Sequence, residues 1–266
     1  MSLRGFSAVL LCVAAVQAVA GETAVKVTIA FVGDPAGSAW LGAVQGLEEA
    51  NLQGQFLGQT YELKAVAADG LAAVQATAVV ADVDAATLAR IGQSLPGVAV
   101  LDVALDDDAL RAACAANVLH LQPSAAMKRD AVAQWQKKNP GAEVTAAAWH
   151  PDAVKYSAEQ LNIRYAKTHG RPMDDHAWGG WAAVKMLSDT VARVQSADAD
   201  KVLGFLRADL AFDGQKGADM SFRDSGQLRQ PVWIVEGGKL VGEAPVKGVA
   251  ASVEDLDSLG PITCKK

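Results

Sequence analysis

The sequence predicts an α/β fold: a doubly wound parallel sheet with helices on its faces, followed by a β-rich C-terminal appendage. Three observations predict this class. Short apolar runs alternate with helical patterns over the first half of the chain, which indicates βαβ units. The run at 25–32 is continuously apolar and β-branched, as strands inside a parallel sheet are. After Phe212 the pattern changes to short strands and turns.

The first half of the chain provides the strands and helices of the sheet. Strands are expected at 25–32, 61–67, 76–81, 98–101, 118–121 and 143–148. Helices are expected at 39–52, in a short stretch at 71–75, from the cap Asp84 to Leu95, and from the cap Ser124 to Lys137. Right-handed crossovers between these strands produce a doubly wound sheet.

The second half begins with helices and ends with strands. A helix at 153–169 ends at Gly170, a second runs from Asp174 and Asp175 to Val194, and a third from Ser196 to Arg207. Strands follow at 220–222, 232–236 and 239–242, with Gly237-Gly238 as a hairpin turn. We therefore expect one α/β domain at 21–266, in which 199–266 provide a helix and the β-rich appendage packed on it.

The composition excludes several classes of protein. The 266 residues are 51% hydrophobic and carry a formal charge of −6. This apolar content is too high for a disordered chain, and the acidic balance lacks the positive charge that a nucleic-acid surface needs. Beyond the N-terminus no apolar run approaches the roughly 20 residues that span a bilayer. The length allows one large domain or two small ones.

Residues 1–20 have the pattern of a secretory signal peptide. Arg4 precedes an apolar segment at 6–16, and Ala18-Val19-Ala20 provides the small residues of a cleavage site. Cys12 follows Leu11, which argues against lipidation. Cleavage after Ala20 removes Arg4 and no acidic residue, so 23 basic residues face 30 acidic ones and the charge becomes −7. The sequence thus predicts an exported, periplasmic protein that does not span the membrane.

The exported chain retains two cysteines, Cys114 and Cys264. In an oxidising compartment such a pair predicts one disulfide, which here closes a long loop and ties down the C-terminal tail. Two free thiols, or a zinc pair lacking further ligands, are the alternatives.

Aspartates follow four consecutive predicted strands. Asp34, Asp69, Asp82 and Asp102 come just past the strand ends, with 106–108 shortly beyond. Parallel strands bring these positions to one sheet edge, where ligands of such sheets bind. Several carboxylates at one edge predict a metal ion such as calcium, or another cationic ligand. The alternative is that aspartate serves as a cap or turn residue, above all Asp69 and Asp84.

Catalytic patterns are scarce. The sequence holds no Gly-x-Ser-x-Gly, no His-Glu-x-x-His and no Cys-x-x-Cys. His120 lies inside a strand and is expected in the core or at its edge, and Trp178 and Trp181 have the spacing of one buried helix face. Asp174, Asp175 and His176 are expected to begin a helix, with metal binding as the alternative. We therefore predict no enzyme.

Several segments have a familiar pattern. They are Phe56-Leu57-Gly58-Gln59, Pro123-Ser124, Gly170-Arg171-Pro172-Met173, Lys216-Gly217, Ser221-Phe222-Arg223, Gly226-Gln227-Leu228-Arg229-Gln230-Pro231 and Leu259-Gly260, with both cysteines. In them the chain resembles the type I periplasmic substrate-binding proteins of ABC transporters that bind leucine, isoleucine and valine. It is most similar to a branch associated with PQQ-dependent alcohol catabolism. The resemblance implies that 34–40 is the first ligand loop.

The resemblance also implies a departure. Family members close two lobes on a ligand, but here on the order of 100 residues, about one lobe, are missing between Asn139 and Trp149. We therefore expect a chain shortened to one lobe with the appendage. Such a chain has no second lobe with which to close on a ligand by a hinge.

Three functions follow from the resemblance. The first is a periplasmic solute-binding or accessory protein that delivers its ligand to an ABC permease; the favoured ligand is a lanthanide or calcium ion held by Asp34, Asp82, Asp102, Asp106 and Asp107. The second is a binder of a small organic solute such as an amino acid, using Asp34, Ser38, Trp40 and Ser124. The third is a protein-interaction module for a periplasmic PQQ dehydrogenase, which docks through the uncovered inter-lobe face.

Overall fold

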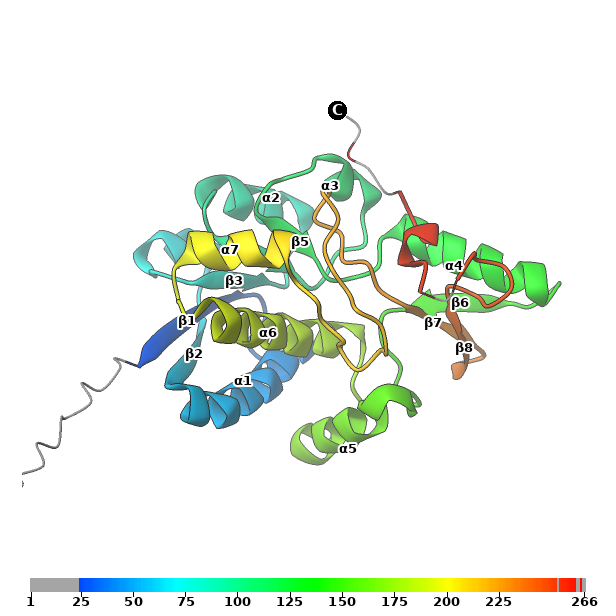
Figure 1. Cartoon of the computed structure of the whole chain (residues 1–266), viewed down its shortest axis with the longest axis horizontal. Coiled ribbons are helices and arrows are strands. Elements are labelled where there is room, and N and C mark those ends of the chain that lie inside the picture. Colours follow the sequence, from blue (N-terminus) through cyan, green and yellow to red (C-terminus); the bar gives the residue numbers. More distant parts are fainter. Residues whose placement is uncertain (1–23, 253, 262–263, 265–266) are drawn as a thin grey trace, which may run out of the picture.

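A parallel five-stranded sheet forms the centre of the molecule (Figure 1). The computed structural model describes residues 24–252, 254–261 and 264, so the predicted signal peptide lies outside the described residues. The strands are β1 Val25–Val32, β2 Gln59–Ala65, β3 Ala78–Ala81, β4 Ala99–Asp102 and β5 Val118–His120. Their order, β2-β1-β3-β4-β5, is that of a doubly wound sheet and confirms the predicted fold class.

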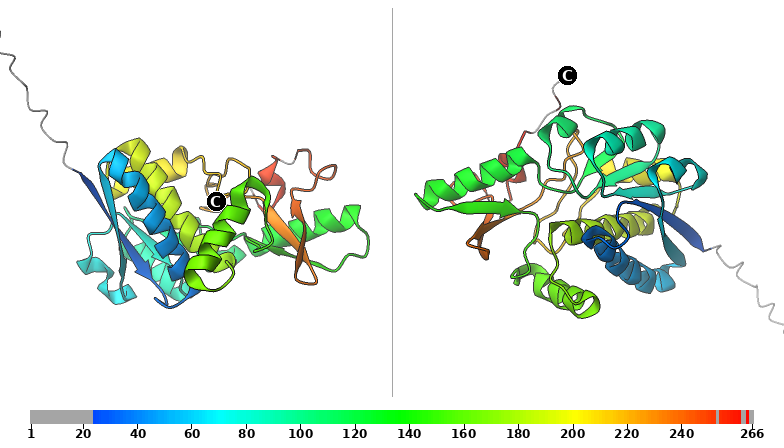
Figure 2. Two further views of the ribbon diagram at one scale, coloured as in Figure 1. Left: turned by 90° about the horizontal axis from the view of Figure 1, so that it is seen from below. Right: turned by 180° about the vertical axis from the view of Figure 1, so that it is seen from behind.

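Helices cover both faces of this sheet (Figures 1 and 2). They are α1 Ser38–Leu57, α2 Ala85–Ser94, α3 Asp108–Ala112, α4 Ala125–Lys138, α5 Ala158–His169, α6 Asp175–Val194 and α7 Ala199–Ala208. Alternate strand residues point to opposite faces, so Phe31 and Leu101 pack with residues of α1, α6 and α7, while Val79 and Val100 pack with α2. The central strands are buried on both sides, which explains their continuously apolar sequence.

Two glycines allow α1 and α6 to cross at close range. A Cβ atom at Gly42 would overlap the carbonyl group of Ala177, and one at Gly180 would overlap the carbonyl group of Ala39. The two helices therefore touch backbone to backbone. This contact fixes α6, and with it the residues at its N-terminus, against the central sheet.

A second, antiparallel sheet lies at one end of the molecule, on the right in Figure 1. It contains β6 Val144–Ala147, β7 Val232–Glu236 and β8 Lys239–Ala244. The helix α4 packs on this sheet, and Met127, Ala131, Val232 and Ile234 belong to an apolar cluster of their own. The strand predicted at 143–148 therefore exists, but it pairs with the C-terminal hairpin rather than with the parallel strands. Residues far apart along the chain thus build the appendage together.

The appendage is less regular than the sequence predicts. The prediction of a strand at 220–222 is wrong. Only isolated β-bridges form there, between Met220 and Phe212 and between Phe222 and Leu228. The segment around Gln227 instead lies beside β5, because Leu228 N–H donates to the carbonyl oxygen of His120 at 3.0 Å. The Gly237-Gly238 hairpin is confirmed; both glycines have the positive φ that a two-residue turn of this kind needs.

Helix ends follow local capping chemistry with some shifts. Asp84 and Ser124 cap α2 and α4 as predicted, since their side chains accept from Thr87 N–H and Met127 N–H. The helix expected from Ser196 begins later, at Ala199, and Asp198 caps it. The first helix runs beyond the expected 52 to residue 57. The helix expected from 153 begins at 158, after a 3-10 turn, Lys155–Ser157.

A disulfide joins Cys114 to Cys264, with the Cα atoms 6.0 Å apart, as predicted. It lies between the end of α3 and the C-terminal tail. No helix in the described ranges is both long and apolar enough to cross a membrane.

Candidate functional site

The carboxyl edge of the central sheet brings together the ends of β1, β3 and α6. Gly33 approaches Asp82 so closely that a Cβ atom there would lie 2.9 Å from the Asp82 Cβ. The Asp82 carboxylate in turn lies 3.2 Å from Nδ1 of His176 in the first turn of α6. This hydrogen bond and the nearby carboxylates raise the pKa of His176 above its ordinary value, although partial burial opposes the shift. An ion pair therefore connects the β3 loop to α6.

An open cavity of about 580 Å³, the edge cavity, lies beside this ion pair. It is lined by Trp149, Pro151, Arg171, Pro172, Met173, Asp174, Asp175 and His176. Trp149 and Met173 are buried and give it an apolar wall. The volume lies within the roughly 300–1,000 Å³ of small-molecule sites.

Both signs of charge lie on the rim of the edge cavity. The guanidinium of Arg171 lies 3.6 Å from the Asp174 carboxylate, and both side chains are about half exposed. Asp174 also caps α6 by accepting from Ala177 N–H at 2.8 Å, so the predicted helix start is confirmed. Asp175 accepts from Trp149 N–H at 2.7 Å, which fixes the apolar wall to the helix. The rim therefore presents one guanidinium and two carboxylates beside an apolar wall.

Asp102 is fully buried and is used inside the protein. Its carboxylate accepts from Ala104 and Leu105 N–H at 3.1 Å each, and it lies 2.7 Å from Nδ1 of His120. Burial is the main cause that lowers the pKa of His120, so the ring is neutral near pH 7 and Nδ1–H donates to the carboxylate. The prediction of a core histidine is confirmed. Neither side chain lines the edge cavity.

The predicted carboxylate crown does not form among the described residues. Asp34 accepts from Ala36 N–H, Asp106 pairs with Lys128 at 2.9 Å, and Asp107 caps α3 through Ala109 N–H. Asp82 and Asp102 are held by their histidines. Within residues 24–252, 254–261 and 264, no group of three or more His, Cys, Asp or Glu side chains is arranged to hold a metal ion. Each of these aspartates is engaged in its own turn, cap or ion pair. The prediction that they converge on one metal ion is therefore wrong.

The predicted ligand residues Asp34, Ser38, Trp40 and Ser124 are not brought to one place. Ser38 begins α1, and Trp40 packs edge-on against Phe31 with 5.2 Å between ring centres. Neither lines the edge cavity, nor does Asp34. Ser124 lines a different, smaller cavity beyond β5. No cavity described above is lined by all four residues, so their use as one binding site stays a prediction.

Sequence reasoning missed most of the edge cavity. It predicts a helix start at 174–176, with metal binding as the alternative, and it assigns no role to Arg171 or Trp149. One signal was available: the segment Arg171-Pro172-Met173-Asp174-Asp175-His176 combines a guanidinium, two carboxylates, an imidazole and two apolar side chains at a helix N-terminus. Trp149 was not predictable, because only the fold stacks it on Trp178, with 6.1 Å between ring centres and 9° between planes.

Comparison with known proteins identifies the architecture. No family model matches the chain, and no curated protein matches it by sequence. Solved structures do. A leucine-, isoleucine-, valine-, threonine- and alanine-binding protein of Brucella ovis, in closed conformation, matches with a TM-score of 0.72 and 12% identity, over 89% of this chain and 97% of that one. A periplasmic binding protein of Burkholderia mallei matches with a TM-score of 0.70 and 12% identity, over 91% and 99%.

A third match is an ABC-type branched-chain amino acid transporter protein of Rhodopseudomonas palustris. Its TM-score is 0.69 at 13% identity, over 90% of this chain and 100% of that chain. At such low identity the likeness concerns the fold. The chain has the fold of the periplasmic binding proteins of branched-chain amino acid ABC transporters.

Proposed function

We propose that this protein is a periplasmic solute-binding protein of an ABC-type uptake system. It binds a small zwitterionic solute such as an amino acid in the edge cavity and delivers it to a membrane permease. The observation that carries the proposal is a cavity of about 580 Å³ at the carboxyl edge of the sheet, with Arg171 beside Asp174 and Asp175 on an apolar wall. The fold likeness to amino-acid-binding proteins and the signal-peptide pattern at 1–20 support it.

The rim chemistry favours an amino acid over a metal ion. Arg171 is suited to a ligand carboxylate, and Asp174 or Asp175 to an ammonium group. An aliphatic side chain would lie against Trp149 and Met173, both buried at the wall. A metal ion, by contrast, would need several oxygen ligands at about 2.3–2.6 Å around one point. The aspartates proposed for it are instead engaged separately, as described above.

We also propose that α4 and the small antiparallel sheet are what remains of a second lobe. They have an apolar cluster separate from the two that flank the central sheet, and β6 enters this unit directly after α4. A unit of this size covers one side of a ligand less fully than a whole lobe does. The expected affinity for an amino acid is therefore weak. The association with PQQ-dependent alcohol oxidation rests on the sequence resemblance and is part of this proposal.

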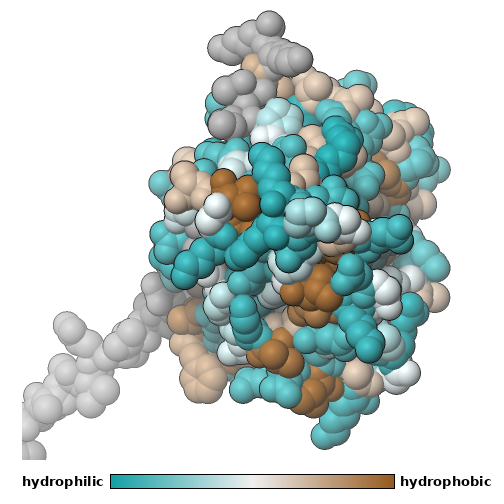
Figure 3. All heavy atoms as spheres, turned by 90° about the vertical axis from the view of Figure 1, so that its right-hand side faces the viewer, coloured by the Kyte–Doolittle hydropathy of each residue, from teal (hydrophilic) through white to brown (hydrophobic). Residues whose placement is uncertain are grey.

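The interaction-module hypothesis gains less support. Figure 3 shows the face that carries the small sheet, where apolar side chains lie in separate patches between hydrophilic ones. Docking surfaces are usually larger and continuous. We therefore retain solute binding as the proposed function.

A calorimetric titration of residues 21–266 tests the proposal. We expect L-leucine or another L-amino acid to bind, and Arg171→Ala and Asp175→Asn each to weaken binding at least tenfold. Arg90→Ala, on the exposed surface of α2, is the matched control and should leave the affinity unchanged. A ligand that binds only the folded state also raises the melting temperature. Binding of calcium or lanthanum without any amino acid would overturn the proposal.

A further inference from the structure

A cavity of about 420 Å³ lies between α2 and α3, beside β5, the outermost strand of the central sheet; we call it the outer cavity (Figure 1). Residues of the segment 113–117, which follows α3, complete its wall. Its volume lies within the roughly 300–1,000 Å³ of small-molecule sites. None of its lining residues lines the edge cavity. The outer cavity is therefore separate from the proposed amino-acid site.

The wall of the outer cavity is mainly apolar. Leu88 of α2 and Leu110 of α3 line it from the two helices. Small residues such as Gly92 and Ala115 also line it and leave the space between the helices unfilled, whereas protein interiors are normally close-packed. Among the described residues no Asp, Glu, Lys or Arg side chain lines the cavity. The wall therefore favours an uncharged ligand, because it offers no counter-charge to an ion.

His120 brings a buried hydrogen-bond acceptor to this wall. The residue is only 1% exposed, and it lines the outer cavity. Its Nδ1 lies 2.7 Å from the Asp102 carboxylate, which accepts the ring proton. Nε2 therefore carries a lone pair, and no residue in the described part of the chain donates to it. A buried acceptor costs stability unless a donor reaches it, so a ligand O–H or N–H at Nε2 would be stabilised.

Asn117 brings a second buried acceptor to the same wall. Its Nδ2 donates to the carbonyl oxygens of Gly92, Leu95 and Val98 at 2.8–3.2 Å. These bonds fix the orientation of the amide, and Oδ1 accepts from no residue that the structure describes. The two buried polar side chains of the wall thus both present acceptors. The outer cavity therefore favours a ligand that donates a hydrogen bond.

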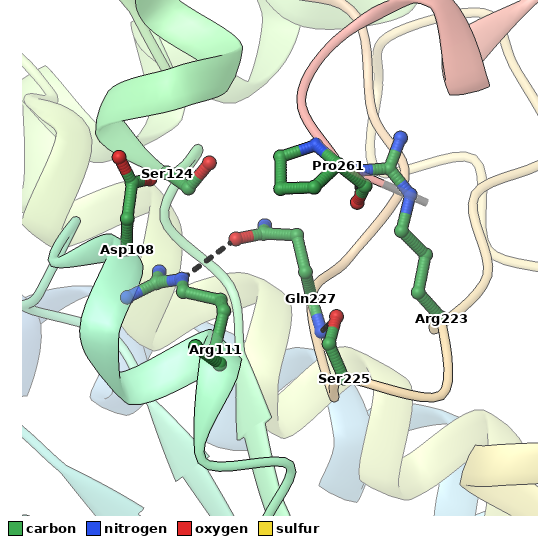
Figure 4. A pocket seen from close by; sticks show the side chains of 8 residues that line it. Asp108, Arg111, Ser124, Arg223, Ser225, Gln227 and Pro261 are labelled. Carbon is green, nitrogen blue, oxygen red and sulfur yellow. Dashed lines mark hydrogen bonds between the residues drawn. The ribbon is translucent and has the colours of Figure 1, made fainter. Parts of the chain in front are cut away.

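The neighbouring cation Arg111 acts on His120 without entering the outer cavity. After burial, which is the main cause, its charge contributes to the lowered pKa of the ring. Figure 4 shows the Arg111 side chain directed toward Gln227, to whose Oε1 its Nε donates at 2.8 Å. Its terminal nitrogens donate to three backbone carbonyl oxygens. Arg111 does not line the outer cavity, so it favours the neutral imidazole and leaves the wall uncharged.

The wall chemistry defines the ligand. We propose that the outer cavity is a binding site for a small neutral alcohol, whose hydroxyl donates to Nε2 of His120 and whose hydrocarbon part lies against Leu88 and Leu110. An acid or an amine would bury its charge against an uncharged wall, which is costly. An amide would bring a carbonyl oxygen to a place where the buried polar groups are acceptors. A ketone of the same shape would leave Nε2 without a donor.

Calorimetric titration of oxidised residues 21–266 with cyclohexanol tests this site. We expect saturable binding of cyclohexanol, and at least tenfold weaker binding of cyclohexanone, which has nearly the same shape but no donor. Ala115→Leu places a larger side chain in the cavity and should weaken cyclohexanol binding at least tenfold. Ala133→Leu, the same change at an exposed alanine of α4, is the matched control and should leave the affinity unchanged.

His120→Asn tests the acceptor itself. The asparagine amide can still donate to Asp102, but no atom replaces Nε2, so cyclohexanol should lose its advantage over cyclohexanone. Should this variant fail to fold, the nitrogen NMR signal of Nε2 in the unchanged protein is the second readout. It should shift on saturation with cyclohexanol and stay in place with cyclohexanone; an unmoved signal with both would overturn the proposal.

The outcomes separate this site from the proposed amino-acid site. Arg171→Ala should leave cyclohexanol affinity unchanged, and excess L-leucine should not compete with cyclohexanol. Absence of saturable binding would overturn the proposal, as would equal binding of alcohol and ketone or an unchanged affinity in Ala115→Leu. Competition by L-leucine would show that cyclohexanol enters the edge cavity instead and would likewise overturn it. Failure of amino-acid binding at the edge cavity has no bearing on this result.

Discussion

The ammonium group of Lys216 lies 3.9 Å from the centre of the Trp178 ring, and both residues are buried. Nζ also donates to Gln230 Oε1 at 2.6 Å and to the carbonyl oxygen of Pro231 at 3.2 Å. Trp178 stacks in turn on Trp149, which lines the edge cavity. The buried lysine therefore supports the aromatic pair behind the candidate binding site. Complete burial lowers the pKa of Lys216 to about 7.

The pKa of Lys216 predicts a pH dependence of stability. Its folded value of about 7 lies below the ordinary value of 10.5, so the unfolded chain binds more protons between these values. The free energy of unfolding should therefore rise with pH from about 7 to 10.5, by on the order of 5 kcal/mol from this group. In Lys216→Met this rise should disappear. Urea unfolding between pH 7 and 10 measures it, with Lys201→Met, an exposed lysine, as the control; equal slopes in Lys216→Met and wild type would refute the prediction.

The ion pair between His176 and Asp82 predicts a titration shift. Because the Asp82 carboxylate stabilises the protonated ring, Asp82→Asn should lower the pKa of His176. The raised pKa contributes stability fully below the unfolded value of about 6.5, and this contribution is lost as the pH rises through the folded value. Proton NMR of the His176 ring follows the midpoint. Asp152→Asn, beside His150, is the control, and an unmoved midpoint in Asp82→Asn would contradict the assignment.

The crossing of α1 and α6 predicts opposite effects of two glycine substitutions. Gly180→Ala should lower the free energy of unfolding by about 1–3 kcal/mol or more, because its Cβ would overlap the Ala39 carbonyl group. Gly204→Ala in α7 meets nothing within 4 Å and should raise it by about 0.5–1 kcal/mol through lower backbone entropy of the unfolded chain. Chemical unfolding of both variants is the measurement. A stable Gly180→Ala would mean that the helices are farther apart than described.

The disulfide predicts a large loss of stability on removal. Cys114 and Cys264 are 150 residues apart, and closing so long a loop is worth on the order of 5 kcal/mol in the chain-entropy model. The double variant Cys114→Ala, Cys264→Ala should therefore melt at a lower temperature than oxidised residues 21–266. Reduced wild type should approach the double variant. As the control, reductant should leave the melting temperature of the double variant unchanged. An equal melting temperature for oxidised wild type and the double variant would show that the cross-link does not stabilise the fold.

Local sequence patterns predicted the elements that depend on local chemistry. The buried strand at 25–32, the caps Asp84 and Ser124 and the Gly237-Gly238 turn are all confirmed. Each rests on side chains within a few residues of one another. The alternation of strands and helices was also enough for the doubly wound class. The same reasoning placed Trp178 and Trp181 in the core, where they are buried.

Local sequence patterns could not predict which distant segments pair with each other. The strand β6 has the composition of a sheet strand but no signal for its partner, and it pairs antiparallel with β7 nearly ninety residues later. For the aspartates at the carboxyl edge, the sheet topology correctly predicted a common edge but not their partners. Each aspartate is engaged by a different group, as Asp106 is by Lys128. Side-chain partners depend on distances that spacing along the chain does not contain.

The sequence by itself determined the fold class and the cysteine pair, because hydrophobic periodicity, turn chemistry and residue counts are local or additive properties. The signal peptide at 1–20 stays a prediction. Only the tertiary structure decided which polar groups meet. It placed Arg171 and Asp175 around one cavity, Asn117 and His120 around another, and Lys216 over Trp178. Binding chemistry depends on such convergence in space, and contacts between residues far apart in the chain exist only once the chain has packed.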